Sequence, residues 1–264
     1  MSDGEQLISA KSLAATYDGG TYEDAWSAVD QYRRATEYAS THDAGSAATA
    51  TALDLPRGQL RAWIDGDGKP DVVRGIEAAR DYGWLDCTYG NAEFTALNAL
   101  VANVFSSGSI AQEYYRPSFT INHLGESSHV FDALELAGVE YKIIDDRDGR
   151  ADEVRPTKDE TVLGRVLASL GAPVGPKAEQ HLSLPSYLEG APKDTREMFV
   201  YAYLENRAVE HGQKATLTIQ EQRNREYLAD LAALIKDVAG GGVNLRENNI
   251  VISADATRRL GQVR

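Results

Sequence analysis

The sequence predicts an α+β protein, with an all-helical N-terminal domain followed by a domain in which one order of helices and strands occurs twice. Two observations lead to this prediction. Residues 46–64 have the pattern of two short helices joined by a tight turn. Residues 94–121 change from helical to strand spacing of their apolar side chains, and a similar succession starts again near residue 196.

The composition sets outer limits on the class of protein. A chain of 264 residues can form one large domain or two ordinary ones. No apolar run approaches the ~20 residues that cross a bilayer and no leader pattern opens the chain, so we expect a cytoplasmic protein without a membrane partner. Cys87 is the single cysteine, which excludes an internal disulfide. The five histidines show no metal-ligand spacing.

The N-terminal region divides into an arm and a helical domain. Residues 1–20 have no clear period and are expected to form a loose arm. Residues 21–86 are expected to form the helical domain, with a first long helix over 22–40 that Thr21 would cap. A later helix over 71–82 would start after Pro70.

Residues 46–64 predict a helix-turn-helix, with its turn at Asp54-Leu55-Pro56. The side chains expected to pack the two helices together are Ala48, Leu53, Leu55, Leu60 and Trp63 or Ile64. This packing leaves Arg57, Gln59 and Arg61 outside, where arginine suits guanine and glutamine suits adenine in a major groove. An ordinary helical hairpin with solvated arginines fits the periodicity equally well.

Residues 94–121 carry the next pattern. The apolar residues with helical spacing are Leu97, Leu100, Val101, Val104 and Phe105. Gly108 would end this helix. Ile110, Gln112 and Tyr114 then alternate with their neighbours as in a strand, Arg116-Pro117 would turn the chain, and residues 118–121 would form a second strand.

The remaining elements complete two halves, residues 91–172 and 193–264, joined by a linker over 173–192. In the first half we expect a helix over 127–137, strands over 139–145 and 151–156, and a helix over 161–170. In the second half we expect a helix over 196–208, a strand over 214–220, a helix over 225–238, a strand pair over 243–253 and a helix over 254–260. The order helix, strand, strand, helix, strand, strand, helix describes the first half, and the second half follows it approximately.

Residues 100–110 resemble the signature of the LAGLIDADG homing endonucleases. The small residue Ala102, at which two signature helices pack closely, is kept, and so is Gly108-Ser109-Ile110. Residues 32–84 resemble the DNA-binding regions that precede LAGLIDADG-like domains. The pairing of the two domains is similar to that in the bacterial WhiA regulators, in the opposite order. The resemblance spans most of residues 94–260, and none of its motifs is intact.

The resemblance implies a pair of metal-binding carboxylates at the ends of the two signature helices. Ser107 and Asn206 occupy these positions here, and Arg207 replaces the second glycine. Neutral side chains cannot supply the charge that holds a divalent metal. Glu205 is one residue away from Asn206, ~100° around a helix, and is expected to point elsewhere. We therefore expect no metal, no cofactor and no catalytic residue.

The resemblance also implies a DNA-binding saddle, formed by the strands of both halves along the major groove. The residues on the corresponding strands are Gln112, Tyr114, Arg116, Ser118, Thr120, Lys142, Arg155, Lys214, Thr216, Gln220, Arg246 and Asn249. A solvated sheet face would account for each of them equally well.

The net charge of −13 argues at first against a nucleic-acid partner. Arginine outnumbers lysine, however, and the Asp-rich segments resemble those of proteins from salt-loving archaea. In concentrated salt little is gained from counterion release, so DNA would be bound through base and shape contacts.

The favoured hypothesis is a sequence-specific double-stranded DNA-binding protein, a transcriptional regulator on a catalytically inactive scaffold, with the transcription machinery or a second copy as further partners. Two alternatives stay open. One is an active metal-dependent endonuclease that uses Glu205 or another acid. The other is a protein-binding scaffold that contacts DNA only through the helix-turn-helix.

Overall fold

The computed structural model describes residues 7–121, 125–145, 151–211 and 214–261. The chain divides into two compact units. One consists of residues 9–81, and the other of residues 1–8 together with 82–264. The division therefore lies ahead of residue 86, at which we expected the helical domain to end.

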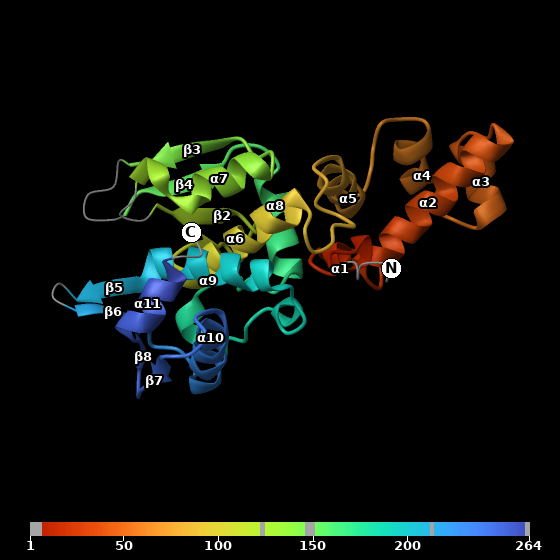
Figure 1. The fold of residues 1–264 in the computed structure, drawn as a ribbon. Coiled ribbons are helices and arrows are strands. Elements are labelled where there is room, and N and C mark those ends of the chain that lie inside the picture. The colour runs from red at the N-terminus through yellow and green to blue at the C-terminus, as the bar shows by residue number, and fades with distance from the viewer. Residues whose placement is uncertain (1–6, 122–124, 146–150, 212–213, 262–264) are drawn as a thin grey trace. The chain divides into compact units, whose positions relative to one another are not determined.

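The unit of residues 9–81 is entirely helical (Figure 1). Its helices are α1 (Ala10–Ala14), α2 (Ala25–His42), α3 (Ser46–Leu53), α4 (Arg57–Ile64) and α5 (Asp71–Asp81). The predicted helix-turn-helix is present as α3 and α4, joined through Asp54 in the left-handed conformation. Ala35, Ala50 and Leu60 form a buried cluster where α2, α3 and α4 meet, with Leu53, Leu55, Trp63 and Ile64 packed against them. Ala48, which we expected at this contact, is exposed, and Ala50 takes its place.

Two expectations for the N-terminal region are wrong. Residues 10–14 form a helix with a capping box at Ser9, and Leu13 is fully buried, so this part of the chain is no loose arm. The long helix starts at Ala25 instead of Tyr22, because Asp24 is its N-cap and accepts a hydrogen bond from the Ser27 N–H at 2.7 Å. A carboxylate at this position satisfies an amide that the helix itself leaves unpaired.

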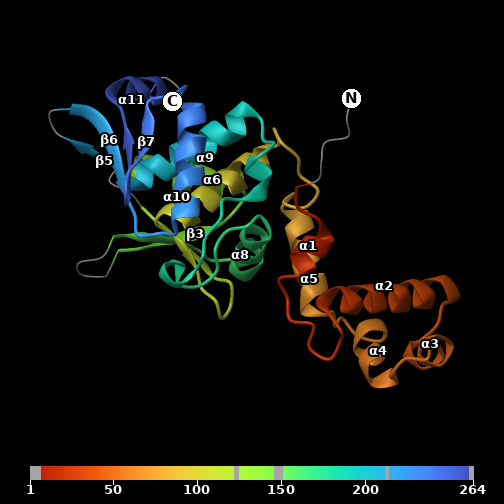
Figure 2. The same ribbon diagram turned by 90° about the horizontal axis from the view of Figure 1, so that it is seen from below.

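The second unit contains the same succession of elements twice (Figures 1 and 2). The first half consists of α6 (Ala92–Ser106), β1 (Ser109–Ile110), β2 (Pro117–Thr120), α7 (His129–Leu136), β3 (Tyr141–Ile144), β4 (Glu153–Pro156) and α8 (Glu160–Ser169). The second half consists of α9 (Lys193–Arg207), β5 (Ala208–His211), β6 (Lys214–Gln220), α10 (Arg225–Val238), β7 (Val243–Leu245), β8 (Asn249–Ile252) and α11 (Ala254–Leu260).

Both halves form an antiparallel sheet with the same strand order, β1-β2-β4-β3 and β5-β6-β8-β7. This identity of topology confirms the α+β class and the predicted duplication. The segment between the halves carries two short 3-10 turns, Lys177–Glu179 and Ser186–Leu188.

The two signature-like helices, α6 and α9, pack against each other between the sheets (Figures 1 and 2). The rings of Phe105 and Phe199 meet edge to face, with centroids 6.1 Å apart. The Asn98 side-chain amide donates to the Thr195 carbonyl at 2.8 Å, and Asn98 Oδ1 accepts from the Tyr187 hydroxyl at 2.8 Å. A helix that is apolar on all sides must lie in a core, and almost the whole of α6 is buried.

Three strand predictions need correction. The chain turns at residues 112–114, so Gln112 and Tyr114 lie outside β1. Pro117 begins β2 instead of turning the chain, because a proline at the first position of a strand has no N–H that needs a ladder partner. Strand β5 directly follows α9 and was not predicted.

Candidate nucleic-acid interface

The first sheet presents polar side chains on the face opposite its buried residues. Phe119 and Val154 are fully buried on the helix side. Their neighbours alternate to the other face. That face, called here the first polar face, carries Ser118, Thr120, Lys142, Glu153 and Arg155.

The charges of the first polar face are partly paired with one another. Glu153 accepts from the Ser118 hydroxyl at 2.7 Å and from Arg155 Nη2 at 2.8 Å. Lys142 is exposed and lies directly across from Arg155 in the strand register. The face thus offers two cations, one of them already neutralised by Glu153, and two hydroxyl oxygens whose hydrogens are donated to Glu153 and to the Ser107 carbonyl.

The second sheet has a corresponding face of neutral side chains. Its described members, called here the second polar face, are Val209, Thr216, Thr218, Gln220, Asn244, Asn249 and Val251. Gln220 pairs with Asn249 across β6 and β8. Amide side chains can donate and accept at once, as the edge of adenine requires. Lys214 belongs to β6, but its side chain lies outside the described residues.

The other predicted strand residues lie in turns. Tyr114 is 55% exposed, and the Arg116 guanidinium lies 5.4 Å from the centre of its ring. Arg116 also pairs with Glu160 at 2.7 Å. Gln112 is exposed in the same turn, and Arg246 is exposed in the turn between β7 and β8. These four side chains border the sheets instead of belonging to them.

The helix-turn-helix places two of its three predicted contacts outward. Arg57 and Arg61 are exposed on α4. Gln59 is half-buried, and its amide donates to the Tyr22 hydroxyl, so it has a structural partner that the sequence pattern did not indicate. Hydrogen bonds from Ser46 hold the pKa of Asp65 below its usual range, and the charges of Arg57 and Arg61 add to this shift.

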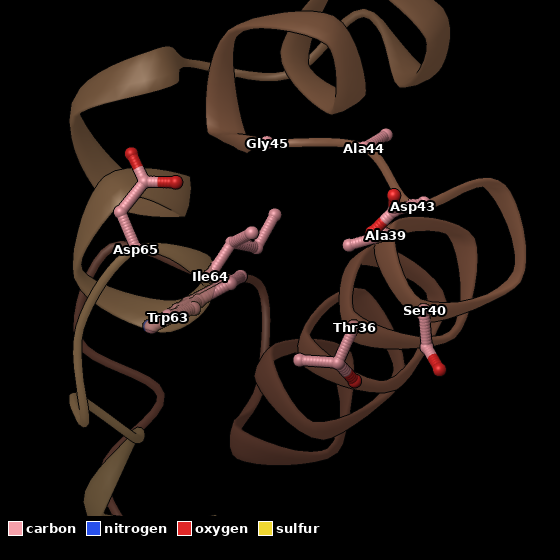
Figure 3. A pocket seen from close by; sticks show the side chains of 9 residues that line it. All are labelled: Thr36, Ala39, Ser40, Asp43, Ala44, Gly45, Trp63, Ile64 and Asp65. Carbon is pink, nitrogen blue, oxygen red and sulfur yellow. The ribbon is translucent and has the colours of Figure 1, made fainter.

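A pocket of 420 Å³ opens between the ends of α2 and α4 (Figure 3). Its lining consists of Thr36, Ala39, Ser40, Asp43, Ala44, Gly45, Trp63, Ile64 and Asp65. The Asp65 carboxylate is bound to the Ser46 hydroxyl at 2.6 Å and to its N–H at 3.1 Å. Asp65 therefore ties the end of α4 to the start of α3, and its position in the pocket is explained by the fold.

The ends of α6 and α9 meet through neutral groups. Asn206 Nδ2 donates to Ser106 Oγ at 2.9 Å. The Ser107 carbonyl accepts from the Thr120 hydroxyl at 3.0 Å. Close packing continues at Gly108, where a Cβ atom would lie 2.6 Å from Asn103 Oδ1 and 2.8 Å from the Ser118 carbonyl.

Glu205 points into the protein, as expected from its position beside Asn206. Its side chain is 2% exposed, and its carboxylate lies 2.5 Å from His129 Nδ1. The Tyr201 hydroxyl donates to the other carboxylate oxygen. Burial raises the pKa of Glu205, but the hydrogen bonds from His129 and Tyr201 outweigh this and bring it below its usual range. Glu205 thereby links α9 to the start of α7.

The metal ions implied by the LAGLIDADG resemblance do not fit the helix ends. Ser107 Oγ and Asn206 Oδ1 are buried without a hydrogen-bond partner among the described residues, but neither carries the negative charge that a hard divalent cation requires. No three His, Cys, Asp or Glu side chains come together as a metal site in the part of the chain that the structure describes.

A group of cations near these helix ends has no signal in the sequence pattern. Arg207 and Arg223 pair with the buried carboxylate of Glu221, and Lys177 binds the end of α6 nearby. Arg207 is the residue in place of the signature glycine. The other two lie in segments without a period, so their proximity follows from the tertiary structure.

The comparisons with known proteins find structural likeness alone. No protein-family model matches the chain, and the comparison with curated proteins gives no match either. The chain is similar to the full-length DUF199/WhiA protein from Thermatoga maritima, with 12% identity and a TM-score of 0.43, over 68% of this chain and 59% of that one. It is also similar to the N-terminal LAGLIDADG domain of DUF199/WhiA, with 12% identity and a TM-score of 0.43, over 69% of this chain and 88% of that one. Among the described helices, none has the length and hydropathy to span a bilayer.

Proposed function

We propose that this protein binds double-stranded DNA in a sequence-specific manner and acts as a transcriptional regulator without nuclease activity. The observation that carries the proposal is the pair of polar sheet faces, one in each half of the duplicated unit. Hydroxyl and amide side chains lie at alternate positions along strands, a spacing at which a sheet can place them against base edges in a groove.

The second polar face supports base recognition in particular. Thr216, Gln220 and Asn249 are neutral and at least partly exposed. Amides bind adenine through paired hydrogen bonds, and threonine can contact a thymine methyl group. Such contacts depend little on salt, whereas phosphate contacts weaken steeply as salt rises. They therefore suit a chain with a net charge of −13 and a salt-rich cytoplasm such as that of halophilic archaea.

The helix-turn-helix supplies a second element for DNA. Arg57 and Arg61 lie one helical turn apart on α4 and are exposed. In helix-turn-helix proteins the second helix enters the major groove, and arginine there binds guanine in a bidentate manner. Two elements in separate units would together cover a site well over ~10 base pairs long.

The absence of nuclease activity is proposed from the ends of α6 and α9. Ser107 and Asn206 are neutral, and the carboxylate of Glu205 is bound to His129 and Tyr201. We expect no nicking of supercoiled plasmid in Mg²⁺ or Mn²⁺ across a range of salt. Metal-dependent nicking that disappears in Glu205→Gln would instead support the endonuclease alternative.

The test is a binding selection on random duplexes in molar potassium chloride with the full chain. The wild type should enrich one long motif. The double variant Arg57→Gln/Arg61→Gln should no longer select one part of this motif. The double variant Gln220→Ala/Asn249→Ala should no longer select another part. The control Arg34→Gln, an exposed change on α2, should select both parts. A short motif lost only in the α4 variant would favour the protein-binding scaffold. No enrichment by the wild type would refute DNA binding.

A further inference from the structure

Two arginines from distant segments share one carboxylate near the ends of the paired helices, and a lysine binds the end of α6 nearby. Lys177 comes from the segment between the halves, Arg207 is the last residue of α9, and Arg223 follows β6. Glu221 lies among them, with a fully buried side chain. These four residues are called the cationic group below.

One oxygen of the Glu221 carboxylate is used within the protein. Its Oε1 atom accepts from Arg207 Nε at 2.6 Å and from the Tyr203 hydroxyl at 2.8 Å. Burial raises the pKa of Tyr203 well above its usual value, so the phenol stays a donor. The Oε2 atom lies 3.7 Å from Arg223 Nε, too far for a hydrogen bond.

Lys177 binds the end of α6. Its ammonium nitrogen lies 2.5 Å from the Val104 carbonyl, 2.9 Å from that of Gly108 and 3.2 Å from that of Phe105. An ammonium group has three donors, and all three are used here. Carbonyl groups at a helix C-terminus carry partial negative charge and stabilise a nearby cation. Lys177 thus places a positive charge at neutral pH where the signature helix ends.

The cationic group has more positive charge than its own acid neutralises. Two arginines pair with one carboxylate and the Lys177 ammonium adds a third cation, which leaves two positive charges in excess within a partly buried cluster. Excess charge of one sign is costly when it is shielded from water. Acids are abundant in a chain of net charge −13, yet none besides Glu221 lies within ion-pair distance of these cations among the described residues.

The two guanidinium groups also keep donors for a ligand. Arg207 uses Nε for Glu221, and its side chain is 32% exposed. Arg223 uses Nη1 for the Gln222 carbonyl, and its buried Nε lies 3.7 Å from Glu221 Oε2, so the donors kept for a ligand are Arg223 Nη2 and the two Nη atoms of Arg207. Guanidinium groups match the oxygen spacing of phosphate and bind it through paired hydrogen bonds.

We propose that Arg207 and Arg223, supported by the charge of Lys177, form an anion site for one phosphate group of the DNA backbone. The site is next to the contact between Asn206 and Ser106, and it uses fixed cations without a divalent metal. The inference rests on the proposed DNA binding for the source of the phosphate. Most contacts of the polar faces suit bases, so this site would fix the position of the duplex along them.

The first test is the salt dependence of duplex binding by the full chain. Arg207→Gln and Arg223→Gln should each weaken binding about tenfold at low salt. Each should also reduce the slope of log K against log salt by about 0.9. Arg258→Gln, which removes the same charge from an exposed position on α11, should keep the wild-type slope. Arg207→Lys retains the charge and should retain most of the slope. Melting temperatures of all variants show whether a loss reflects unfolding.

The second test observes the site directly. The Nε–H signals of Arg207 and Arg223 in nitrogen-15 spectra of the full chain should shift on titration with inorganic phosphate, and should shift further with duplex DNA at equal ionic strength. EDTA should change neither result.

The outcomes separate the two proposals. Unchanged salt slopes in folded variants, together with unmoved arginine signals, would refute the anion site and leave DNA binding intact. If the wild type binds no duplex but inorganic phosphate shifts both arginine signals, the anion site stands and the DNA function falls. A parallel titration with sodium chloride at the same ionic strength is the control, and equal shifts with chloride and with phosphate would indicate an adventitious ion only.

Discussion

The side-chain amide of Asn206 donates a 2.9 Å hydrogen bond to the hydroxyl of Ser106, at the point where α9 meets α6. The Ser106 hydroxyl in turn bonds back to the Ala102 carbonyl at 2.9 Å. Two neutral groups therefore join the halves at the place where the LAGLIDADG resemblance implies two acids and metal. This contact favours closure of the helix pair over the retention of an ion.

Asn206→Asp should destabilise the protein at neutral pH. The carboxylate has no hydrogen to donate to Ser106 Oγ, and we expect a loss of about 1–3 kcal/mol in the free energy of unfolding. Urea unfolding at pH 7 and pH 4 measures it, and the loss should shrink at the lower pH as the acid becomes protonated. Asn249→Asp makes the same change on a partly exposed strand and should cost less. Equal losses at the two sites would contradict the structural role of Asn206.

Gly164→Ala should be strongly destabilising, because the new Cβ atom would lie 1.7 Å from the Tyr115 carbonyl oxygen. Helix α8 would have to move away from the turn before β2, at a cost of about 3 kcal/mol. Gly58→Ala in α4 meets nothing within 4 Å and should instead stabilise by about 0.5–1 kcal/mol. Thermal unfolding of both variants provides the comparison, and a tolerated Gly164→Ala would mean that α8 packs differently.

The pair of His129 and Glu205 should make stability depend on acid pH. The folded pKa of Glu205 is lower than its usual 4.5. Its contribution is therefore fully present above pH 4.5 and is lost as the pH falls through the folded value. Glu205→Gln should lower the free energy of unfolding by about 1–3 kcal/mol at pH 7. The free energy of unfolding of this variant should also depend less on pH below pH 4.5. Exposed Glu189→Gln should follow the wild type at every pH. If the free energy of unfolding of Glu205→Gln changed with pH in parallel with that of the wild type, Glu205 would not be the group responsible for the acid dependence.

Lys177 should make stability rise with pH as well, but in the alkaline range. Burial and the charge of Arg223 lower its pKa from 10.5 to about 8. Between these values the unfolded chain binds more protons than the folded one, so the contribution of Lys177 to stability rises with pH. The difference in unfolding free energy between wild type and Lys177→Met should grow by about 2 kcal/mol from pH 7.5 to pH 9.5. Lys158→Met, at an exposed position, should show no such growth.

The long periodic segments were predictable from sequence, and the short irregular ones were not. The spacing of apolar residues gave α3, α4 and α6 nearly to the residue, since one helical face decides where each of them lies. The alternation from Ile110 to Tyr114 predicted a strand, but the chain turns there. Tyr115 adopts a left-handed conformation and packs against Gly164, far away in sequence. Local propensity carries no information about such a contact.

The sequence by itself determined the α+β class, the helix-turn-helix, the duplication and the lack of acids at Ser107 and Asn206, because these depend on periodicity and residue type. The tertiary structure alone decided which side chains share a site. It placed Glu205 against His129 and Gln59 against Tyr22, and it brought Arg207 and Arg223 to Glu221 and Lys177 to the end of α6. Those contacts join residues from separate elements, and the packing of α6 against α9 between two sheets sets their distances.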